Sequence, residues 1–179
     1  MKEKGGADTL EVVATRIAAA LGEDGVLVGG MAVAAWGYVR ATDDVDFVAR
    51  LAPSRVVERL KTAGIRSRIH RGGDVPDDGI EWCVKGRLDG VAFDVLPPLV
   101  PLHLDQAVTI RLAPGRAVRV VDLDGLLRLK LKAGGPQDLL DVAQLLRKHP
   151  QMRAKVRPVA EAYGQWQGLQ HWLNDPRLR

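Results

Sequence analysis

Two aspartates, Asp44 and Asp46, stand two residues apart in the segment from Val26 to Arg50. On a β-strand, residues two apart share one face, so both carboxylates would project together while the apolar residues beside them point the other way. Two unit charges about 4 Å apart repel by roughly 1 kcal/mol in water and about 4 kcal/mol near a protein surface. Two carboxylates in one pocket therefore need a bound cation, a shared proton or a larger distance between them. Mg²⁺ is the usual cation beside a phosphate substrate. A solvated acidic turn, which Asp43 favours, is the alternative.

A glycine pair, Gly29 and Gly30, follows the apolar run from Val26 to Val28. The run predicts a buried strand, and the Ala-rich residues from Met31 to Tyr38 predict a helix after the glycines. Glycines at this turn would let a substrate approach the backbone closely, and the N–H groups of a helix start attract phosphate. Packing alone can also require glycine at a strand-to-helix turn.

A third carboxylate, Asp94, lies within the apolar strand predicted from Val91 to Val95. Alternation turns Asp94 away from its apolar neighbours. A carboxylate within a central strand is costly unless it is paired or bound to metal. Three carboxylates from two strands, facing a glycine-capped helix start, would make a site for two metals. Such a site positions a triphosphate, activates an attacking hydroxyl and stabilises the leaving pyrophosphate.

These residue types occur in a fixed order along the chain, at Gly29, Gly30, Arg40, Thr42, Asp44 and Asp46. The order resembles the signature of the nucleotidyltransferase superfamily, which has a polymerase β-like fold. The form Arg-x-Thr-x-Asp-x-Asp is similar to the branch that contains AbiEii-like toxins and uncharacterised bacterial nucleotidyltransferases. The resemblance implies that Asp44 and Asp46 bind Mg²⁺ or Mn²⁺ and that Asp94 completes the set as a general base. It also implies that the glycine pair lies against the triphosphate of an NTP.

The segment from Asp122 to Leu146 looks like the C-terminal segment of the same branch, in which a helix lysine precedes an Asp-x-x-Asp helix start. Lys130 matches the lysine, and Asp138 and Asp141 match the acidic pair. The resemblance implies that Lys130 reaches the nucleotide phosphates. The turn between the two helices departs from the pattern, because Gly135 and Gln137 stand where basic residues are common.

We therefore assign Arg40, Thr42 and Lys130, with the glycine pair, to nucleotide binding. Each assignment has an alternative. Arg40 could pair with an acidic residue and orient it, Lys130 could be a solvated surface lysine, and Asp138 could simply favour the positive end of a helix.

A basic cluster runs from Arg66 to Arg71 and includes Arg68 and His70. It could contact a nucleic acid or another long anionic substrate, and the alternative is a solvated loop. A second basic cluster, from Arg147 to Arg157, leaves the same two interpretations open.

The chain has 179 residues, of which 46% are hydrophobic and 27% charged, with a formal net charge of +4. This length predicts one domain, or one domain with a helical appendage. A mild positive excess suits an anionic partner such as a nucleotide or RNA, although an ordinary basic protein has it too. The single cysteine, Cys83, excludes an internal disulfide and fits a reducing cytosol. No signal-like segment and no run of ~18 apolar residues is present, so we expect a cytoplasmic protein without membrane association.

The periodicity of apolar residues predicts a mixed sheet flanked by helices and followed by a helical C-terminal part, an α+β fold. We place a domain boundary near Val121, with a nucleotidyltransferase core at 1–121 and a helical region at 122–179. The predicted helices are 9–21, 31–38, 53–63, 123–132 and 136–148, and the predicted strands are 26–28, 45–49, 80–84, 91–95, 108–112 and 117–121.

Two functions remain open at this stage. The first is an enzyme that transfers a nucleoside monophosphate from an NTP to a hydroxyl of a small molecule, a protein or a tRNA, including the toxin of a toxin–antitoxin pair with its cognate antitoxin as partner. The second is an inactive binding module with the same fold. A dinucleotide-binding fold is disfavoured, because the Gly-x-Gly-x-x-Gly fingerprint is missing.

Overall fold

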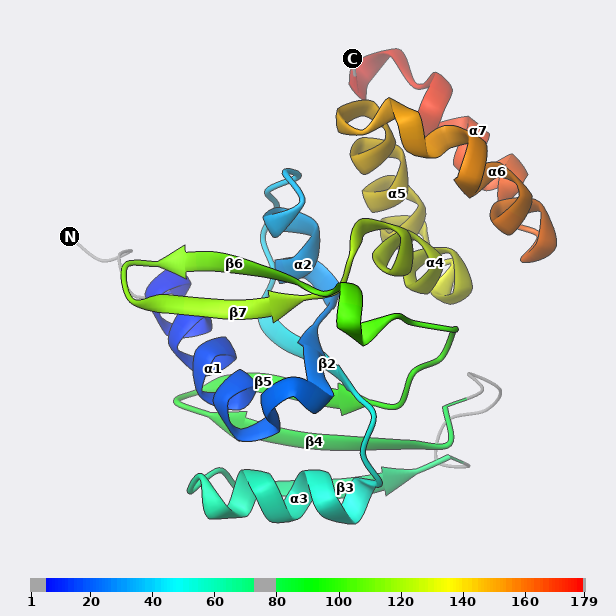
Figure 1. Cartoon of the computed structure of the whole chain (residues 1–179). Coiled ribbons are helices and arrows are strands. Elements are labelled where there is room, and N and C mark those ends of the chain that lie inside the picture. Colours follow the sequence, from blue (N-terminus) through cyan, green and yellow to red (C-terminus); the bar gives the residue numbers. More distant parts are fainter. Residues whose placement is uncertain (1–5, 73–79, 179) are drawn as a thin grey trace.

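The computed structural model describes residues 6–72 and 80–178. Helices and strands alternate in the first half of the chain, strands follow, and helices complete it (Figure 1). The elements are α1 (Gly6–Leu21), β1 (Gly25–Leu27), α2 (Gly29–Ala35), β2 (Asp44–Ala49), α3 (Pro53–Thr62), β3 (Ser67–Arg71), β4 (Trp82–Leu88), β5 (Val91–Leu96), β6 (Val108–Ala113), β7 (Arg116–Val120), α4 (Leu123–Ala133), α5 (Pro136–Lys148), α6 (Arg153–Ala162) and α7 (Trp166–Asn174).

The described strands form one mixed sheet in the order β3-β4-β5-β2-β1-β7-β6. β2 pairs in parallel with β5 and antiparallel with β1, and β1 pairs in parallel with β7. The predicted α+β fold with a mixed sheet is therefore confirmed. None of the helices within the described ranges is long and apolar enough to cross a membrane.

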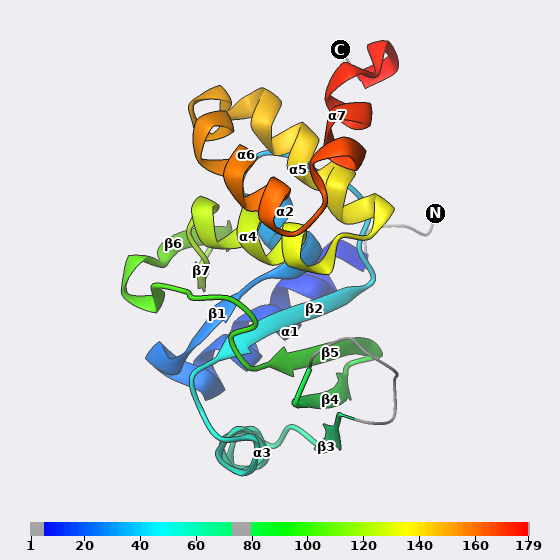
Figure 2. The same cartoon turned by 90° about the vertical axis from the view of Figure 1, so that its right-hand side faces the viewer.

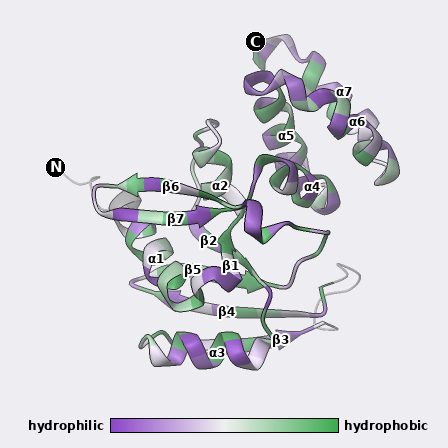
Figure 3. Ribbon diagram, viewed as in Figure 1, coloured by the Kyte–Doolittle hydropathy of each residue, from purple (hydrophilic) through white to green (hydrophobic). Residues whose placement is uncertain are grey.

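The strands at the centre of the sheet separate apolar from acidic side chains by alternation. On β2, Val45 and Phe47 are fully buried, whereas Asp44 and Asp46 lie on the other face and keep contact with solvent. The helix α3 packs against β3 and β4, and both hydrophilic and hydrophobic residues occur along it (Figure 3). It is amphipathic, because Val56 is buried whereas Arg55 and Glu58 are exposed. The apolar face of β2 packs into the core, and this packing fixes the position of the acidic face on the other side of the strand.

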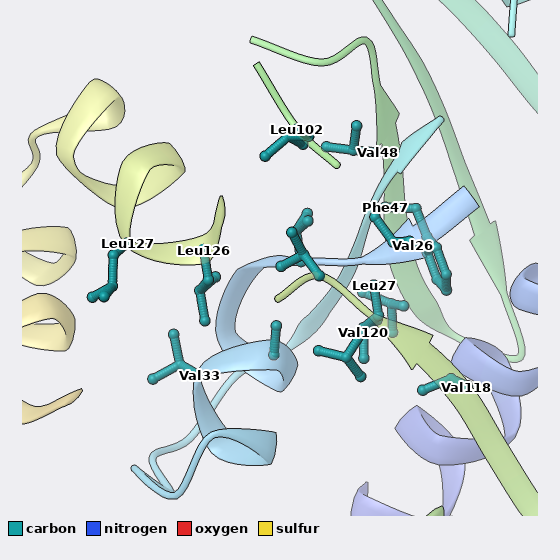
Figure 4. Close-up of a cluster of buried hydrophobic side chains, with 14 of the residues drawn as sticks. Val26, Leu27, Val33, Phe47, Val48, Leu102, Val118, Val120, Leu126 and Leu127 are labelled. Carbon is teal, nitrogen blue, oxygen red and sulfur yellow. The ribbon is translucent and has the colours of Figure 1, made fainter. Parts of the chain in front are cut away.

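The hydrophobic core joins the sheet to the first of the C-terminal helices. Figure 4 shows Val33 of α2 between Val120 of the sheet and Leu126 and Leu127 of α4. All four side chains are at most 1% exposed. The helices α4 to α7 gather on one side of the sheet, as Figure 2 shows. The division into residues 1–121 and 122–179 stays a prediction.

Local sequence patterns predicted the bounds of most helices and strands to within a few residues of those in the structure. The turn between β4 and β5 has positive φ at Asp89 (51°) and Gly90 (84°), which are the angles of a tight hairpin turn, so the predicted hairpin is confirmed. Asp122 caps α4 by accepting a hydrogen bond from the backbone N–H of Gly125. The helix predicted from Thr9 begins instead at Gly6, so Thr9 is not its N-cap.

The structure makes the basic segment after α3 the strand β3, so the alternative of a solvated loop is wrong, whereas the alternative of a nucleic-acid contact stays a prediction. The strand β3 pairs antiparallel with β4 at the edge of the sheet. Its only aliphatic residue is Ile69, so apolar alternation gave little signal. Exposed charges are common on edge strands, because they discourage pairing with another chain.

Candidate functional site

The predicted carboxylates meet on one face of two adjacent strands. Asp46 on β2 and Asp94 on β5 are direct partners in the parallel register. Such partners project from the same face, about 5 Å apart at the backbone. Asp44 precedes Asp46 by two residues and therefore shares this face. The structure thus brings together the three carboxylates that the sequence singled out.

The glycine pair lies directly against this acidic group. Gly29 begins α2 with φ of +65°, and a Cβ atom at this position would lie 2.0 Å from Oδ2 of Asp46. A Cβ at Gly30 would lie 2.6 Å from the hydroxyl oxygen of Thr42. Glycine is therefore required at both positions for the turn to approach the strand.

Thr42 connects the glycine turn to the first aspartate. Its hydroxyl donates a hydrogen bond to Oδ1 of Asp44 over 2.9 Å. Thr42 contacts both Gly30 and Asp44, so its observed role is to orient the acidic group. Its assignment to nucleotide binding stays a prediction.

The surroundings of Asp46 disfavour its charged form. Burial, and then the charges of Asp44 and Asp94, raise its pKa from 3.8 to about 6, although Lys130 and Lys85 act in the opposite direction. Asp46 lines a crevice of about 180 Å³ whose other walls are largely apolar, formed by residues such as Leu96 and Leu129. A carboxylate in such surroundings takes up a cation or a proton readily.

Lys85 is a site residue that sequence reasoning missed. Its Nζ lies 2.6 Å from Oδ2 of Asp94, and the two residues are register partners on β4 and β5. The hydrogen bond to Asp94 raises the pKa of Lys85. A signal was available: a tight turn at Asp89-Gly90 fixes the hairpin register and places Lys85 opposite Asp94.

A second charged group joins the sheet side of the molecule to the C-terminal helices. Arg40 makes two parallel hydrogen bonds to Asp141, with Nε–Oδ1 at 2.8 Å and Nη2–Oδ2 at 2.9 Å. Lys130 contacts the same carboxylate at 3.1 Å and Asp138 at 2.7 Å. Arg40 pairs with an acidic residue, as one alternative predicted, and its assignment to nucleotide binding stays a prediction. Lys130 is only 11% exposed and is not a solvated surface lysine.

Asp141 is fully buried, yet its pKa lies below the ordinary value. Burial by itself raises the pKa, but hydrogen bonds from Arg40 and Gln137 and the nearby charge of Lys130 outweigh it. Lys130 also lines the crevice beside Asp46. Its predicted contact with nucleotide phosphates stays a prediction.

The acidic group has the donor chemistry of a site for Mg²⁺ or Mn²⁺, since both ions prefer carboxylate oxygens. The raised pKa of Asp46 reflects burial first and then repulsion from Asp44 and Asp94, and a bound cation would offset both. Among residues 6–72 and 80–178, however, no three His, Cys, Asp or Glu side chains are grouped so that they could together hold a metal ion. In the structure as it stands, Thr42 holds one oxygen of Asp44, and Lys85 holds one of Asp94.

Cys83 lies beside this group on β4 and is buried. Burial, and then the charge of Asp94, raise the pKa of its thiol to about 12. Reactive cysteines have a lowered pKa. Cys83 is therefore a structural residue rather than a nucleophile.

Comparison with known proteins gives a result only at the level of structure. No protein-family model matches the sequence, and no curated protein sequence matches it significantly. The structure of ANT(2″)-Ia in complex with adenylyl-2″-tobramycin has a TM-score of 0.60 and 14% identity, covering 87% of this chain and 97% of that one. A protein of Thermotoga maritima described as a nucleotidyltransferase has a TM-score of 0.53 and 16% identity, covering 82% and 94%. The chain thus has the nucleotidyltransferase fold, as the resemblance implied, and the AbiEii-like branch stays a prediction.

Proposed function

We propose that this protein transfers a nucleoside monophosphate from an NTP to a hydroxyl group of an acceptor. The observation that supports this most strongly is the position of Asp44, Asp46 and Asp94 on one face of β2 and β5, against the turn at Gly29. The shared fold agrees with this proposal. ANT(2″)-Ia, whose bound molecule is an adenylylated tobramycin, offers an example of the product that such a transfer gives.

In this proposal, Asp44, Asp46 and Asp94 would hold Mg²⁺ or Mn²⁺ after their side chains turn toward one another, since as they stand they are not grouped to hold a metal ion together. When bound, the metal supplies positive charge to the triphosphate and to the leaving pyrophosphate. The backbone of Gly29 lies against Asp46, so the triphosphate would lie next to both residues. Lys130, which lines the same crevice as Asp46, adds a fixed positive charge.

In this proposal, Asp94 activates the acceptor hydroxyl. The acceptor oxygen attacks the α-phosphorus, the bond from that phosphorus to the pyrophosphate oxygen breaks, and Asp94 takes the hydroxyl proton as general base. Lys85 donates a hydrogen bond to Oδ2 of Asp94 and positions the carboxylate for this role. Lys85 is therefore a positioning residue.

Isothermal calorimetry with Mg²⁺ and each of the four NTPs tests the first requirement. We expect the wild type to bind at least one NTP, and the double variant Asp44→Asn/Asp46→Asn to bind it at least ~100-fold more weakly, because two of the three ligands of the cation are lost. Asp43→Asn is the matched control, since Asp43 is exposed and lies one residue before β2. Binding of no NTP, or equal binding by the double variant, would refute the proposed function.

A non-catalytic binding module is the second candidate. It is favoured by the ion pairs that engage Lys85, Arg40 and Lys130 within the chain, since these cations would otherwise face a substrate. Incubation with labelled NTPs and a total RNA pool separates the two. Label incorporation that falls at least ~100-fold in Asp94→Asn supports the enzyme. Retained NTP binding without incorporation into RNA, protein or small molecules supports the module.

The finer assignments follow from this proposal and stay predictions. They are a toxin role with a cognate antitoxin, a tRNA or other RNA as acceptor, and a cytoplasmic location. The identity of the neighbouring genes would address the toxin role, because a small regulator gene beside this one is expected for a toxin pair.

A further inference from the structure

One face of the sheet carries a row of four charged residues on four adjacent strands. Arg68 on β3 pairs with Lys85 on β4, Lys85 pairs with Asp94 on β5, and Asp94 pairs with Asp46 on β2. Register partners project from the same face of a sheet. The row therefore runs from two cations to two carboxylates, and Asp94 is the carboxylate next to the cations.

A hollow of about 640 Å³ lies beside the cationic end of this row. Three elements converge on it: the end of α3, the strand β3 with the residues before it, and β4. Five exposed cations line this basic hollow, at Lys61, Arg66, Arg68, Lys85 and Arg87. None of its ten described lining residues is acidic.

The cations of the basic hollow are largely uncompensated. Within the described part of the chain, only Lys85 has a carboxylate partner, and that partner is Asp94. An edge strand can use lysine and arginine merely to discourage aggregation. That explanation accounts for Arg68, but not for Lys61 and Arg66, which lie outside strands and line the same hollow.

We propose that the basic hollow binds the sugar–phosphate backbone of a nucleic-acid acceptor, so that the terminal hydroxyl of the strand reaches Asp94. The proposal rests on the proposed function and names the acceptor class of the same site. On the side of β2, Asp94 neighbours Asp46, against which Gly29 lies, and the triphosphate would lie there. On the other side, Asp94 contacts Lys85, which lines the basic hollow.

The dimensions agree with a bound strand. Neighbouring β-strands lie about 5 Å apart, so the backbone of Lys85 lies about 5 Å from Asp94 and that of Arg68 about 10 Å. A helical nucleic-acid strand carries one phosphate per ~3.4 Å of its axis, so the distance from Asp94 to Arg68 corresponds to about three nucleotides. A cationic small-molecule acceptor would be repelled by the same surface.

Fluorescence anisotropy with a labelled 12-nucleotide RNA bearing a free 3′ hydroxyl tests the proposal between 50 and 200 mM NaCl. The test variant is Arg66→Gln/Arg68→Gln. The matched control is Arg111→Gln/Lys132→Gln, which removes the same charge from exposed positions on β6 and α4, outside both basic clusters. A DNA strand of the same sequence shows whether the hollow distinguishes the two sugars.

We expect the test variant to bind the RNA about tenfold more weakly than the wild type at low salt. Its plot of log K against log salt should be flatter by about 1.4, because single strands lose ~0.7 per phosphate contact. The control should bind as the wild type does, and Arg66→Lys/Arg68→Lys should restore the slope, since charge alone is needed. NTP binding of the test variant should be unchanged.

Equal RNA affinity and slope in the wild type and the test variant would overturn the proposal. So would transfer of label from an NTP to tobramycin but not to RNA or DNA. Either result leaves the proposed function intact. Absence of NTP binding in the wild type would instead refute the proposed function, whatever the RNA titration gives.

Discussion

Asp46 and Asp141 are carboxylates withdrawn from solvent in two regions of the molecule, and their surroundings act on them in opposite ways. Asp141, on α5, receives hydrogen bonds from Arg40 and Gln137 and an ion pair from Lys130, and its pKa is lowered. Asp46, on β2, lies among Asp44, Asp94 and apolar walls, and its pKa is raised to about 6.

The difference separates a carboxylate whose charged form the fold favours from one whose charged form it disfavours. The charge of Asp141 is compensated inside the chain, so it joins α5 to the segment before β2 without any ligand. The charge of Asp46 is only partly offset by Lys130 and Lys85, so the folded chain keeps it at a cost in stability. Strongly perturbed carboxylates of the second kind cluster at functional sites, whereas compensated ion pairs occur throughout protein structures. Three measurements can break or sharpen this contrast.

Asp141→Asn should have the largest effect. It leaves Arg40 and Lys130, whose side chains are only 21% and 11% exposed, without their shared carboxylate. Breaking a buried ion pair by removing one partner costs about 3–5 kcal/mol of unfolding free energy. Urea denaturation measures the loss, with the exposed Asp105→Asn as the control substitution. A loss below about 1 kcal/mol would place Asp141 with the surface ion pairs and remove the contrast.

Asp46→Asn should have an intermediate effect that depends on pH, measured in metal-free buffer. The folded state holds the proton of Asp46 more tightly than the unfolded chain, because the pKa is about 6 in place of 3.8. Protonated Asp46 therefore stabilises the folded state relative to the unfolded chain. This stabilisation is complete below pH 3.8 and is lost as the pH rises to about 6.

The asparagine variant lacks this loss. Its unfolding free energy relative to the wild type should thus increase across the same window, by up to about 3 kcal/mol at ~1.4 kcal/mol per pKa unit. Urea titrations at pH 4.5, 5.5 and 6.5 measure the increase. The difference between Asp105→Asn and the wild type should stay flat over this range. A flat difference for Asp46→Asn would show that the charge of Asp46 is compensated after all.

Lys85→Met should have the smallest effect on stability. The side chains of Lys85 and Asp94 are 50% and 29% exposed, and such pairs contribute about 0–1 kcal/mol. Urea denaturation at pH 7 measures this change beside Arg55→Met, which removes one partner of the exposed Arg55–Glu58 pair. A loss above about 2 kcal/mol in Lys85→Met alone would assign Lys85 to the fold rather than to the site.

The sequence by itself determined which residues share a face and where most elements begin. Alternation on β2 aimed Asp44 and Asp46 together, and the Asp-Gly turn fixed the hairpin that contains Asp94. These features follow from the local geometry of a strand and of a two-residue turn, which need no other part of the chain.

Only the tertiary structure decided which distant residues meet. The parallel register that places Asp46 beside Asp94 depends on the order of the whole sheet, and the pairing of Arg40 with Asp141 joins residues 101 positions apart. The edge strand β3 exists because β4 offers it a partner, although its own residues alternate poorly. Hydrogen bonds between strands and ion pairs between helices form where packing brings their partners together, and a single segment of sequence does not specify that packing.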